Sequence, residues 1–304
     1  MSLSIQVDKE NPRLEVKGTY SGSVGRTFGT DITNAVQPPN IDEHDTSNPQ
    51  RLGYLAKEIF KYLHSIETRY LPEPNYMALQ PHINYKMRGI LVDWLVEVHL
   101  KFKLQPETLF LSVNLLDRYL SAATVERSKF QLLGVGALMV ACKYEEIYAP
   151  EIYDLVYITD KAYTPEELLL IEKTILKVLD YNVTTPSAFR FLERYTRLQE
   201  SSEYGFQLAR YMVELALVEY GMLKYIPSLL AASAVYLGNK IMGVGHAWPK
   251  VLMENTPYKQ NDLKMCAKEL CILLQNAPKG SLQSVRKKFM QPNFKQVASI
   301  KPSD

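Results

Sequence analysis

Reactive side chains are present in this chain, but their spacing matches no catalytic or metal-binding signature. The five histidines, at positions 44, 64, 82, 99 and 246, share no ligand-like spacing, and the three cysteines form no C-x-x-C pair. The sequence contains no Gly-rich phosphate loop with its lysine, no H-E-x-x-H motif and no G-x-S-x-G motif. We therefore predict a protein that is not an enzyme and uses no metal or cofactor, while a site assembled from distant loops stays open as an alternative.

The acidic pair Glu145 and Glu146 is a weak candidate for acid and base chemistry. Adjacent residues on a helix point in different directions, so the two carboxylates cannot share one substrate oxygen. We interpret the pair as a solvated helix end.

A more unusual feature is an apolar helix predicted over residues 84–101, which leaves only a thin polar strip. Its apolar residues are Met87, Ile90, Leu91, Val92, Trp94, Leu95, Val96 and Val98. Such a helix is either buried at the centre of a domain or partly a docking surface. In the second interpretation Met87, Ile90, Leu91 and Trp94, at i, i+3, i+4 and i+7, form an exposed groove floor that takes a leucine side chain from a peptide.

Composition limits the remaining function classes. The 304 residues are 46% hydrophobic and 22% charged, which indicates a globular chain long enough for two domains. The formal net charge of +2 provides no field to hold a phosphate backbone, so nucleic acid is not an expected partner. The longest apolar stretches, residues 132–142 and 229–238, are shorter than the ~20 residues of a membrane span. The N-terminal residues are charged and do not resemble a signal peptide, so we expect a reducing compartment and no membrane partner.

The pattern along the chain predicts an all-α protein. Residues 1–48 are rich in Gly, Pro and polar residues and are expected to form a disordered tail. An amphipathic helix follows from Arg51, and Pro72 and Pro74 close it. The run Thr164-Pro165-Glu166-Glu167 is typical of a capping box that starts a helix ending near Leu179.

An internal repeat divides the helical part into two domains of similar plan. When the chain is shifted by 97 positions, four helical segments coincide, and Asp117, Lys143 and Glu172 fall on Glu214, Lys240 and Glu269. Each copy also has one helix crowded with small residues, around Gly134 and around Ala231, as a central helix requires. The boundary is expected in residues 181–186, so the predicted domains are residues 49–183, with the preceding helix, and residues 184–304, with a C-terminal extension.

Several long motifs, in the correct order, resemble the cyclin family and its mitotic A and B types. The run Met87-Arg88-Gly89-Ile90-Leu91-Val92-Asp93-Trp94-Leu95 is similar to the M-R-x-I-L-x-D-W-L signature of the cyclin box. Residues 107–120, 132–151 and 157–160 resemble the family's following helices and loop. The resemblance spans about residues 51–298 and implies two tandem five-helix cyclin-box domains, preceded by an N-terminal helix and a disordered tail.

The resemblance also implies a function, namely a regulatory subunit that binds and activates a cyclin-dependent Ser/Thr protein kinase and controls cell-cycle progression at G2/M or S/M. Lys143 and Glu172 match the family's lysine and glutamate that hydrogen-bond beside the kinase C helix, and on the surface they could also pair with each other. The other implied kinase contacts are Tyr144, Glu146, Ile147, Ile59, Leu55 and Tyr181. For Ile147, burial in the core stays open as an alternative.

A second implied surface recruits substrates and inhibitors that carry an Arg-x-Leu motif. Its residues are Met87, Ile90, Leu91, Trp94, Glu97 and Gln131, with Glu97 placed to meet the arginine of the peptide. Arg88 and Asp117 match a pair that ties the first box's helices together, so we expect them to be structural.

Three further features belong to the second box and the tail. Arg194 and Arg210 resemble basic residues of a phosphate-binding pocket of B types, although Phe206 stands where that pattern has a histidine. Lys9-Glu10-Asn11 spells a KEN box, which the anaphase-promoting ubiquitin ligase reads, and residues 26–34 resemble a destruction box with Gly29 in the leucine position. Residence in both nucleus and cytoplasm is expected.

One alternative belongs to a different class, because cyclin-box repeats also build transcription factors and scaffolds without kinase activation. That class requires a strongly basic face and an N-terminal zinc ribbon. A net charge of +2 and three cysteines do not favour it.

Overall fold

The computed structural model describes residues 41–45 and 52–300. All regular elements in these ranges are helical, which confirms the all-α prediction. The α-helices are α1 Ile41–His44, α2 Ala56–Ile66, α3 Tyr85–Phe102, α4 Pro106–Ala122, α5 Phe130–Glu145, α6 Ile152–Ile158, α7 Pro165–Val178, α8 Ala188–Leu198, α9 Glu203–Val218, α10 Pro227–Ile241, α11 Lys250–Asn255, α12 Gln260–Asn276 and α13 Ser284–Phe289. The 3₁₀ turns are η2 Gly53–Leu55, η3 Glu67–Tyr70, η4 Tyr76–Leu79, η5 Arg127–Lys129, η6 Tyr220–Lys224, η7 Pro292–Phe294 and η8 Val297–Ser299.

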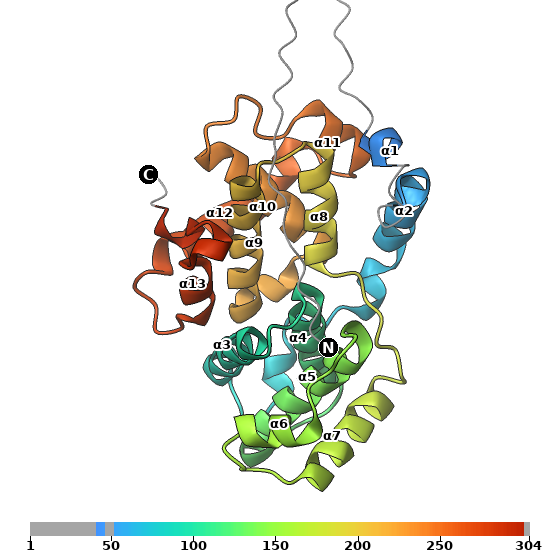
Figure 1. Ribbon diagram of the computed structural model, residues 1–304, viewed down its shortest axis with the longest axis vertical. Helices are drawn as coiled ribbons and strands as arrows, with labels where there is room; N and C mark the ends of the chain where they lie inside the picture. Colours follow the sequence, from blue (N-terminus) through green and yellow to red (C-terminus); the bar gives the residue numbers. More distant parts are fainter. Residues whose placement is uncertain (1–40, 46–51, 301–304) are drawn as a thin grey trace, which may run out of the picture. The chain divides into compact units, whose positions relative to one another are not determined.

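Helices α3 to α7 form one five-helix set, the first repeat, and α8 to α12 form another, the second repeat (Figure 1). Helix α4 begins at Pro106 and α9 at Glu203, while α5 begins at Phe130 and α10 at Pro227, so both pairs are 97 positions apart. The shift found in the sequence therefore places helix on helix, and the prediction of two five-helix domains with a preceding helix is confirmed.

The small residues explain how each repeat is built around one central helix. In α5, a Cβ atom added at Gly134 would lie 2.8 Å from Leu91 of α3, and one added at Gly136 would lie 2.6 Å from Ile171 of α7. A larger residue at either position would have to displace Leu91 or Ile171, so the two glycines allow α3 and α7 to pack closely against α5. In α10 the same purpose is served by fully buried alanines such as Ala231 and Ala234, because α10 packs against α8, α9 and α12.

The start of α7 forms as the sequence predicts. Thr164 Oγ1 accepts a hydrogen bond from the Glu167 amide at 3.3 Å, and Glu167 Oε2 accepts one from the Thr164 amide at 3.0 Å. Pro165 occupies the first helical position, where no amide donor is needed. This box fixes the register of α7.

Buried carboxylates occupy equivalent positions in the two repeats, but their cations come from different elements. Asp117 of α4 receives two hydrogen bonds, of 2.7 and 2.6 Å, from Arg88 of α3, which confirms the expected structural pair. A third Arg88 nitrogen donates to the Leu217 carbonyl at the end of α9, at 2.9 Å, so this side chain joins the two repeats. In the second repeat, Glu214 of α9 is paired with Lys288 of α13. The C-terminal extension thus completes the second repeat.

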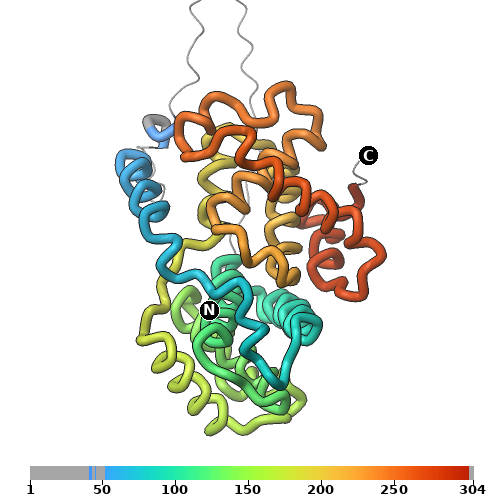
Figure 2. The backbone as a smooth tube through the Cα atoms, turned by 180° about the vertical axis from the view of Figure 1, so that it is seen from behind, coloured from blue at the N-terminus to red at the C-terminus, as the bar shows by residue number. Residues whose placement is uncertain are grey.

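Helix α2 precedes the first repeat in the chain but packs against the second. Phe60 lies edge-on to Phe191 of α8, with ring centroids 6.1 Å apart. Glu67 accepts hydrogen bonds from the amide and hydroxyl of Ser228 at the start of α10, at 2.9 and 2.7 Å. Figure 2 shows this segment running along the second repeat before it reaches the first.

Candidate functional site

The predicted kinase-binding pair lies on the surface of the first repeat. Lys143 is in the last turn of α5 and Glu172 is in α7, and Lys143 Nζ lies 2.6 Å from Glu172 Oε1 and 2.7 Å from Oε2. The lysine side chain is 51% exposed and the glutamate 16%. An exposed pair of this kind contributes little to folding. It does present a cation and an anion together at a surface.

The other predicted kinase contacts differ in exposure, and most of them are exposed apolar side chains. Ile147, which follows α5, is 90% exposed, so the interpretation of Ile147 as core is wrong. Tyr144 and Tyr181 are 50% and 65% exposed, and Leu55 is 41% exposed, whereas Ile59 is half-buried. Tyr181 has a φ of 55°, and this left-handed turn ends α7. Apolar groups so exposed do not stabilise the isolated fold and are available to a partner.

The structure gives Glu146 an internal role. Its Oε1 atom accepts hydrogen bonds from the Gln105 amide, at 2.7 Å, and from the Thr108 hydroxyl. The carboxylate therefore caps the start of α4, where free amide donors and the helix dipole favour a negative charge. The interpretation as a solvated helix end holds for the exposed Glu145, the last residue of α5, and is wrong for Glu146.

Sequence reasoning did not identify Tyr148, Leu169 and Leu170, which are 91%, 51% and 64% exposed. Leu169 lies one turn before Glu172 in α7 and shares its side of the helix. The sequence does contain a pattern that predicts exposed leucines here, because three consecutive leucines of a helix, at positions 168–170, cannot all face one core. Only Leu168 is buried.

The predicted docking groove lies along α3, but its residues are not all exposed. Ile90 is 60% exposed, Met87, Trp94 and Gln131 are half-buried, and Leu91 is only 5% exposed. Leu91 is buried because its side chain fills the space that Gly134 leaves beside α5. The expectation of an exposed floor therefore holds for Ile90 and is wrong for Leu91.

Beyond the groove, acidic side chains of α3 contact the C-terminal extension. The Ser284 hydroxyl lies 2.7 Å from Asp93 Oδ2 and 2.9 Å from Glu97 Oε1, and the Ser284 amide donates to Asp93 Oδ1 at 3.0 Å. Glu97 stays exposed. The extension thus contacts two carboxylates in the middle and second half of α3.

The arginines of the suggested phosphate pocket have partners within the fold. Arg194 is paired with Asp42 of α1 and lies over the Phe60 ring, and Arg210 Nε donates to Glu214 at 2.9 Å. Both arginines are buried. Lys9, Glu10 and Asn11, and residues 26–34, lie outside the described residues.

Residues 41–45 and 52–300 contain no group of three or more His, Cys, Asp or Glu side chains placed to hold a metal ion. Within the same ranges, no helix combines the length and apolar character needed to cross a membrane.

Comparison with known proteins identifies the family. Residues 58–184 match the family model described as "Cyclin, N-terminal domain", and residues 186–303 match "Cyclin, C-terminal domain". A G2/mitotic-specific cyclin-B of Marthasterias glacialis is 39% identical over 273 residues, covering 90% of this chain and 70% of that protein. Cyclin-A1 of Mus musculus is 40% identical over 294 residues, covering 96% of this chain and 66% of that protein.

A solved structure agrees in fold. The X-ray structure of a viral cyclin from herpesvirus saimiri superposes with a TM-score of 0.65 at 19% identity, covering 75% of this chain and 99% of that one. The chain spans 62% and 70% of the lengths of the first two curated relatives that it matches. With both domain matches and both repeats in place, the chain belongs to the cyclin family and is similar to its mitotic A and B types.

Proposed function

We propose that this protein is a regulatory subunit that binds and activates a cyclin-dependent Ser/Thr protein kinase and has no catalytic activity of its own. The observation that carries the proposal is the Lys143–Glu172 pair on the surface of the first repeat, together with the exposed apolar side chains of Tyr144, Ile147 and Tyr181. A folded monomer gains nothing from exposing such groups. A partner that covers them gains both apolar burial and charge-assisted hydrogen bonds.

The proposed mechanism is a population shift in the kinase. The C helix of a protein kinase carries a glutamate that must pair with the strand lysine holding the ATP phosphates. A helical surface that packs only against the active position of that helix stabilises the active state by its differential affinity. In this proposal Lys143 and Glu172 bind backbone groups beside the C helix, and Ile147 and Tyr181 supply apolar contact.

The corresponding residues of the second repeat do not pair with each other as Lys143 and Glu172 do, and this difference supports placing the kinase on the first repeat. Glu269 is the counterpart of Glu172, but it accepts a hydrogen bond from Lys224 of η6 at 2.8 Å. Lys240, the counterpart of Lys143, lies over the Tyr236 ring at 5.7 Å. The two side chains therefore have other contacts.

Substrate recruitment is the second part of the proposal. Ile90, with the half-buried Met87 and Trp94, offers an apolar surface for the leucine of an Arg-x-Leu motif. Glu97 and Asp93 offer negative charge for its arginine. The Ser284 amide donates to Asp93, and the one hydrogen of its hydroxyl is available to Asp93 or to Glu97.

The tail and the cellular setting complete the proposal. Lys9-Glu10-Asn11 would present the protein to the anaphase-promoting ubiquitin ligase. In this proposal the protein activates its kinase at G2/M or S/M, in both nucleus and cytoplasm. The mitotic names of the relatives support this timing.

Kinase activation by purified protein tests the central proposal. The protein is mixed with a monomeric cyclin-dependent kinase, and histone phosphorylation is recorded. We expect strong activation, and a 10- to 100-fold loss of kinase affinity for the Lys143→Ala/Glu172→Ala variant, because hydrogen bonds to charged groups contribute about 1.5–3 kcal/mol.

The matched control is Lys224→Ala/Glu269→Ala, the corresponding pair of the second repeat, with side chains 50% and 30% exposed. It should activate as well as the unmodified protein. Failure of the unmodified protein to activate several such kinases would contradict the proposal and favour a scaffold or transcription-factor role. Equal losses of kinase affinity in both variants would show that Lys143 and Glu172 do not contact the kinase.

A further inference from the structure

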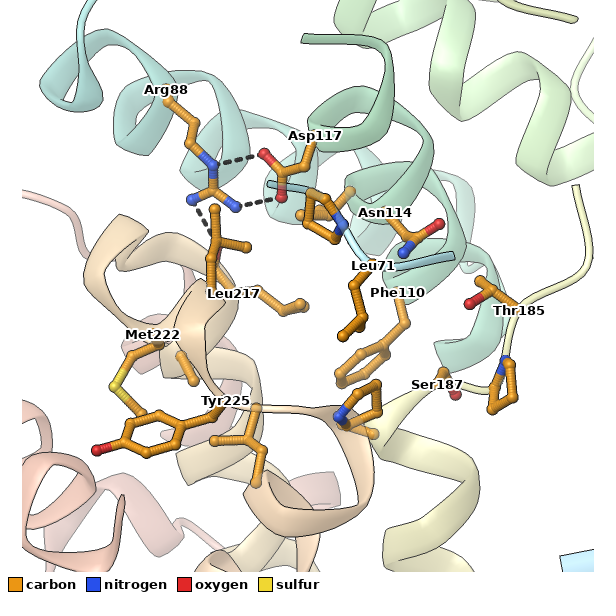
Figure 3. Close-up of a pocket in the computed structure, with 18 residues that line it drawn as sticks. Leu71, Arg88, Phe110, Asn114, Asp117, Thr185, Ser187, Leu217, Met222 and Tyr225 are labelled. Atoms are coloured by element: carbon orange, nitrogen blue, oxygen red, sulfur yellow. Dashed lines mark hydrogen bonds and ion pairs between the residues drawn. The ribbon is translucent and has the colours of Figure 1, made fainter. Parts of the chain in front are cut away.

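A cavity of about 100 Å³ lies where the two repeats meet (Figure 3). The first repeat contributes Phe110 and Val113 of α4, and the second contributes Ala216 of α9 and Leu230 of α10. Leu71, from the segment after α2, closes one side. Elements far apart in the sequence therefore line one small space, which is partly open to solvent.

Four of the polar side chains that line this space, those of Arg88, Asp117, Asn114 and Ser187, have partners within the fold. The Arg88 guanidinium and the Asp117 carboxylate, at one end, are bonded to each other. Asn114 Nδ2 donates to the Tyr70 carbonyl at 3.2 Å, and Ser187 Oγ accepts from the Arg190 amide at 3.1 Å. A buried water needs two to four polar partners, so this arrangement holds water poorly.

The volume of the space also suits a small apolar molecule better than water. An apolar cavity of roughly 150 Å³ binds benzene or xenon in a folded protein, so about 100 Å³ suits one small ring or a branched aliphatic group. The aliphatic and aromatic walls offer contact on several sides, and a ligand there would regain the dispersion contacts that a void forfeits.

We propose that this cavity is a binding site for a small apolar molecule, carrying a single ring or a branched aliphatic group, and that the bound molecule strengthens the packing of the two repeats. Its walls come from both repeats, so the site exists only when they are packed together. A ligand that binds only the packed state raises the stability of that state by mass action. This site is distinct from the proposed kinase and substrate surfaces.

Thermal unfolding of the full chain with benzene tests the proposal, and no kinase is needed. Benzene should raise the melting temperature in a saturable manner. Benzoate, which has the same ring and a negative charge, should leave it unchanged because its carboxylate would lose water without gaining a partner. Equal effects of benzene and benzoate, or no shift at saturating benzene, would overturn the proposal.

A second experiment fills the cavity with a larger side chain. Ala216 is 4% exposed and lines the space, so Ala216→Leu should abolish the benzene shift. A benzene shift as large in Ala216→Leu as in the unmodified chain would place the ligand elsewhere and overturn the proposal. If Ala216→Leu fails to fold, Leu71→Ala gives the opposite test, because the enlarged cavity should accept naphthalene, which the unmodified chain should reject. Identical responses of both chains to naphthalene would also overturn it.

Discussion

Lys288 Nζ lies 2.6 Å from Glu214 Oε2, and both side chains are completely buried although the residues are 74 positions apart. Burial alone would raise the pKa of Glu214, but the charges of Lys288 and Arg210 outweigh it and lower that pKa. Burial lowers the pKa of Lys288, and Glu214 opposes this shift. The C-terminal helix α13 is therefore joined to the second repeat through charges that depend on each other.

Lys288→Ala should destabilise the protein by about 3–5 kcal/mol, because it leaves a buried carboxylate with one cation fewer. The free energy of unfolding in urea, followed by circular dichroism, measures the loss. The triple variant Lys288→Met/Glu214→Leu/Arg210→Met is the control, because it removes all three charges together and leaves none of them without a partner. It should recover most of the stability, and a triple variant no more stable than Lys288→Ala would contradict this prediction.

His99 predicts how stability depends on pH. Burial, and then the nearby charge of Lys288, lower the pKa of His99 to about 4. The unfolded chain, with a histidine pKa near 6.5, therefore binds a proton between about pH 6.5 and 4 that the folded chain does not bind. The contribution of His99 should be complete above pH 6.5 and should decline by roughly 2–4 kcal/mol as the pH falls to 4.

The variant His99→Gln isolates this effect. Its amide cannot titrate but can still donate to the Gln105 carbonyl, which the His99 ring contacts at 3.0 Å. Urea unfolding at several pH values between 4 and 7 should show a shallower decline in the variant. If the free energy of unfolding declined equally with pH in the unmodified protein and in the variant, His99 would not be the cause of the decline.

Arg88 should couple the two repeats. Arg88→Lys keeps the positive charge but cannot form the two-pronged bond to Asp117 and also reach the end of α9, so we expect a loss of about 1–3 kcal/mol from buried acceptors left without a donor. Arg190→Lys serves as the control, because Arg190 is 52% exposed in its pair with Glu193 and should lose less than about 1 kcal/mol. Urea unfolding reports both values, and equal losses would deny Arg88 its bridging role.

Ile90 tests the proposed docking surface without disturbing the core. Ile90→Ser should change the free energy of unfolding by less than about 0.5 kcal/mol, as at other surface positions. With an activated kinase complex, it should reduce phosphorylation of Arg-x-Leu substrates more than that of short peptides without the motif. Met265→Ser, at a 67% exposed position of α12, should affect neither substrate class. Equal losses on both classes would rule out the docking role of Ile90.

The fold could be predicted in large part because its signals are local. The Thr164 capping box, the glycines of α5 and the 97-position shift each follow from residue types at short or regular spacing. The pairing of Arg88 with Asp117 was expected from the family resemblance. The bond from Arg88 to the end of α9 was not, because nothing local to either segment indicates how the two repeats pack.

The exposure of the candidate residues was harder to predict. Leu91 and Ile90 are neighbours of similar hydrophobicity, yet one is buried and the other is 60% exposed. The difference depends on Gly134, 43 positions beyond Leu91 in the chain, which makes room for one of them. The role of Glu146 at the start of α4 likewise depends on a contact between distant segments.

The packing of α2 against the second repeat has a consequence for folding during synthesis. Glu67 leaves the ribosome 161 residues before Ser228, its partner at the start of α10. At roughly 5–20 residues per second this interval is on the order of 10–30 s. During that time the first repeat can form, whereas α2 cannot yet pack because α8 and α10 have not both been synthesised. We therefore expect the packing of α2 against the second repeat to be among the last steps of folding.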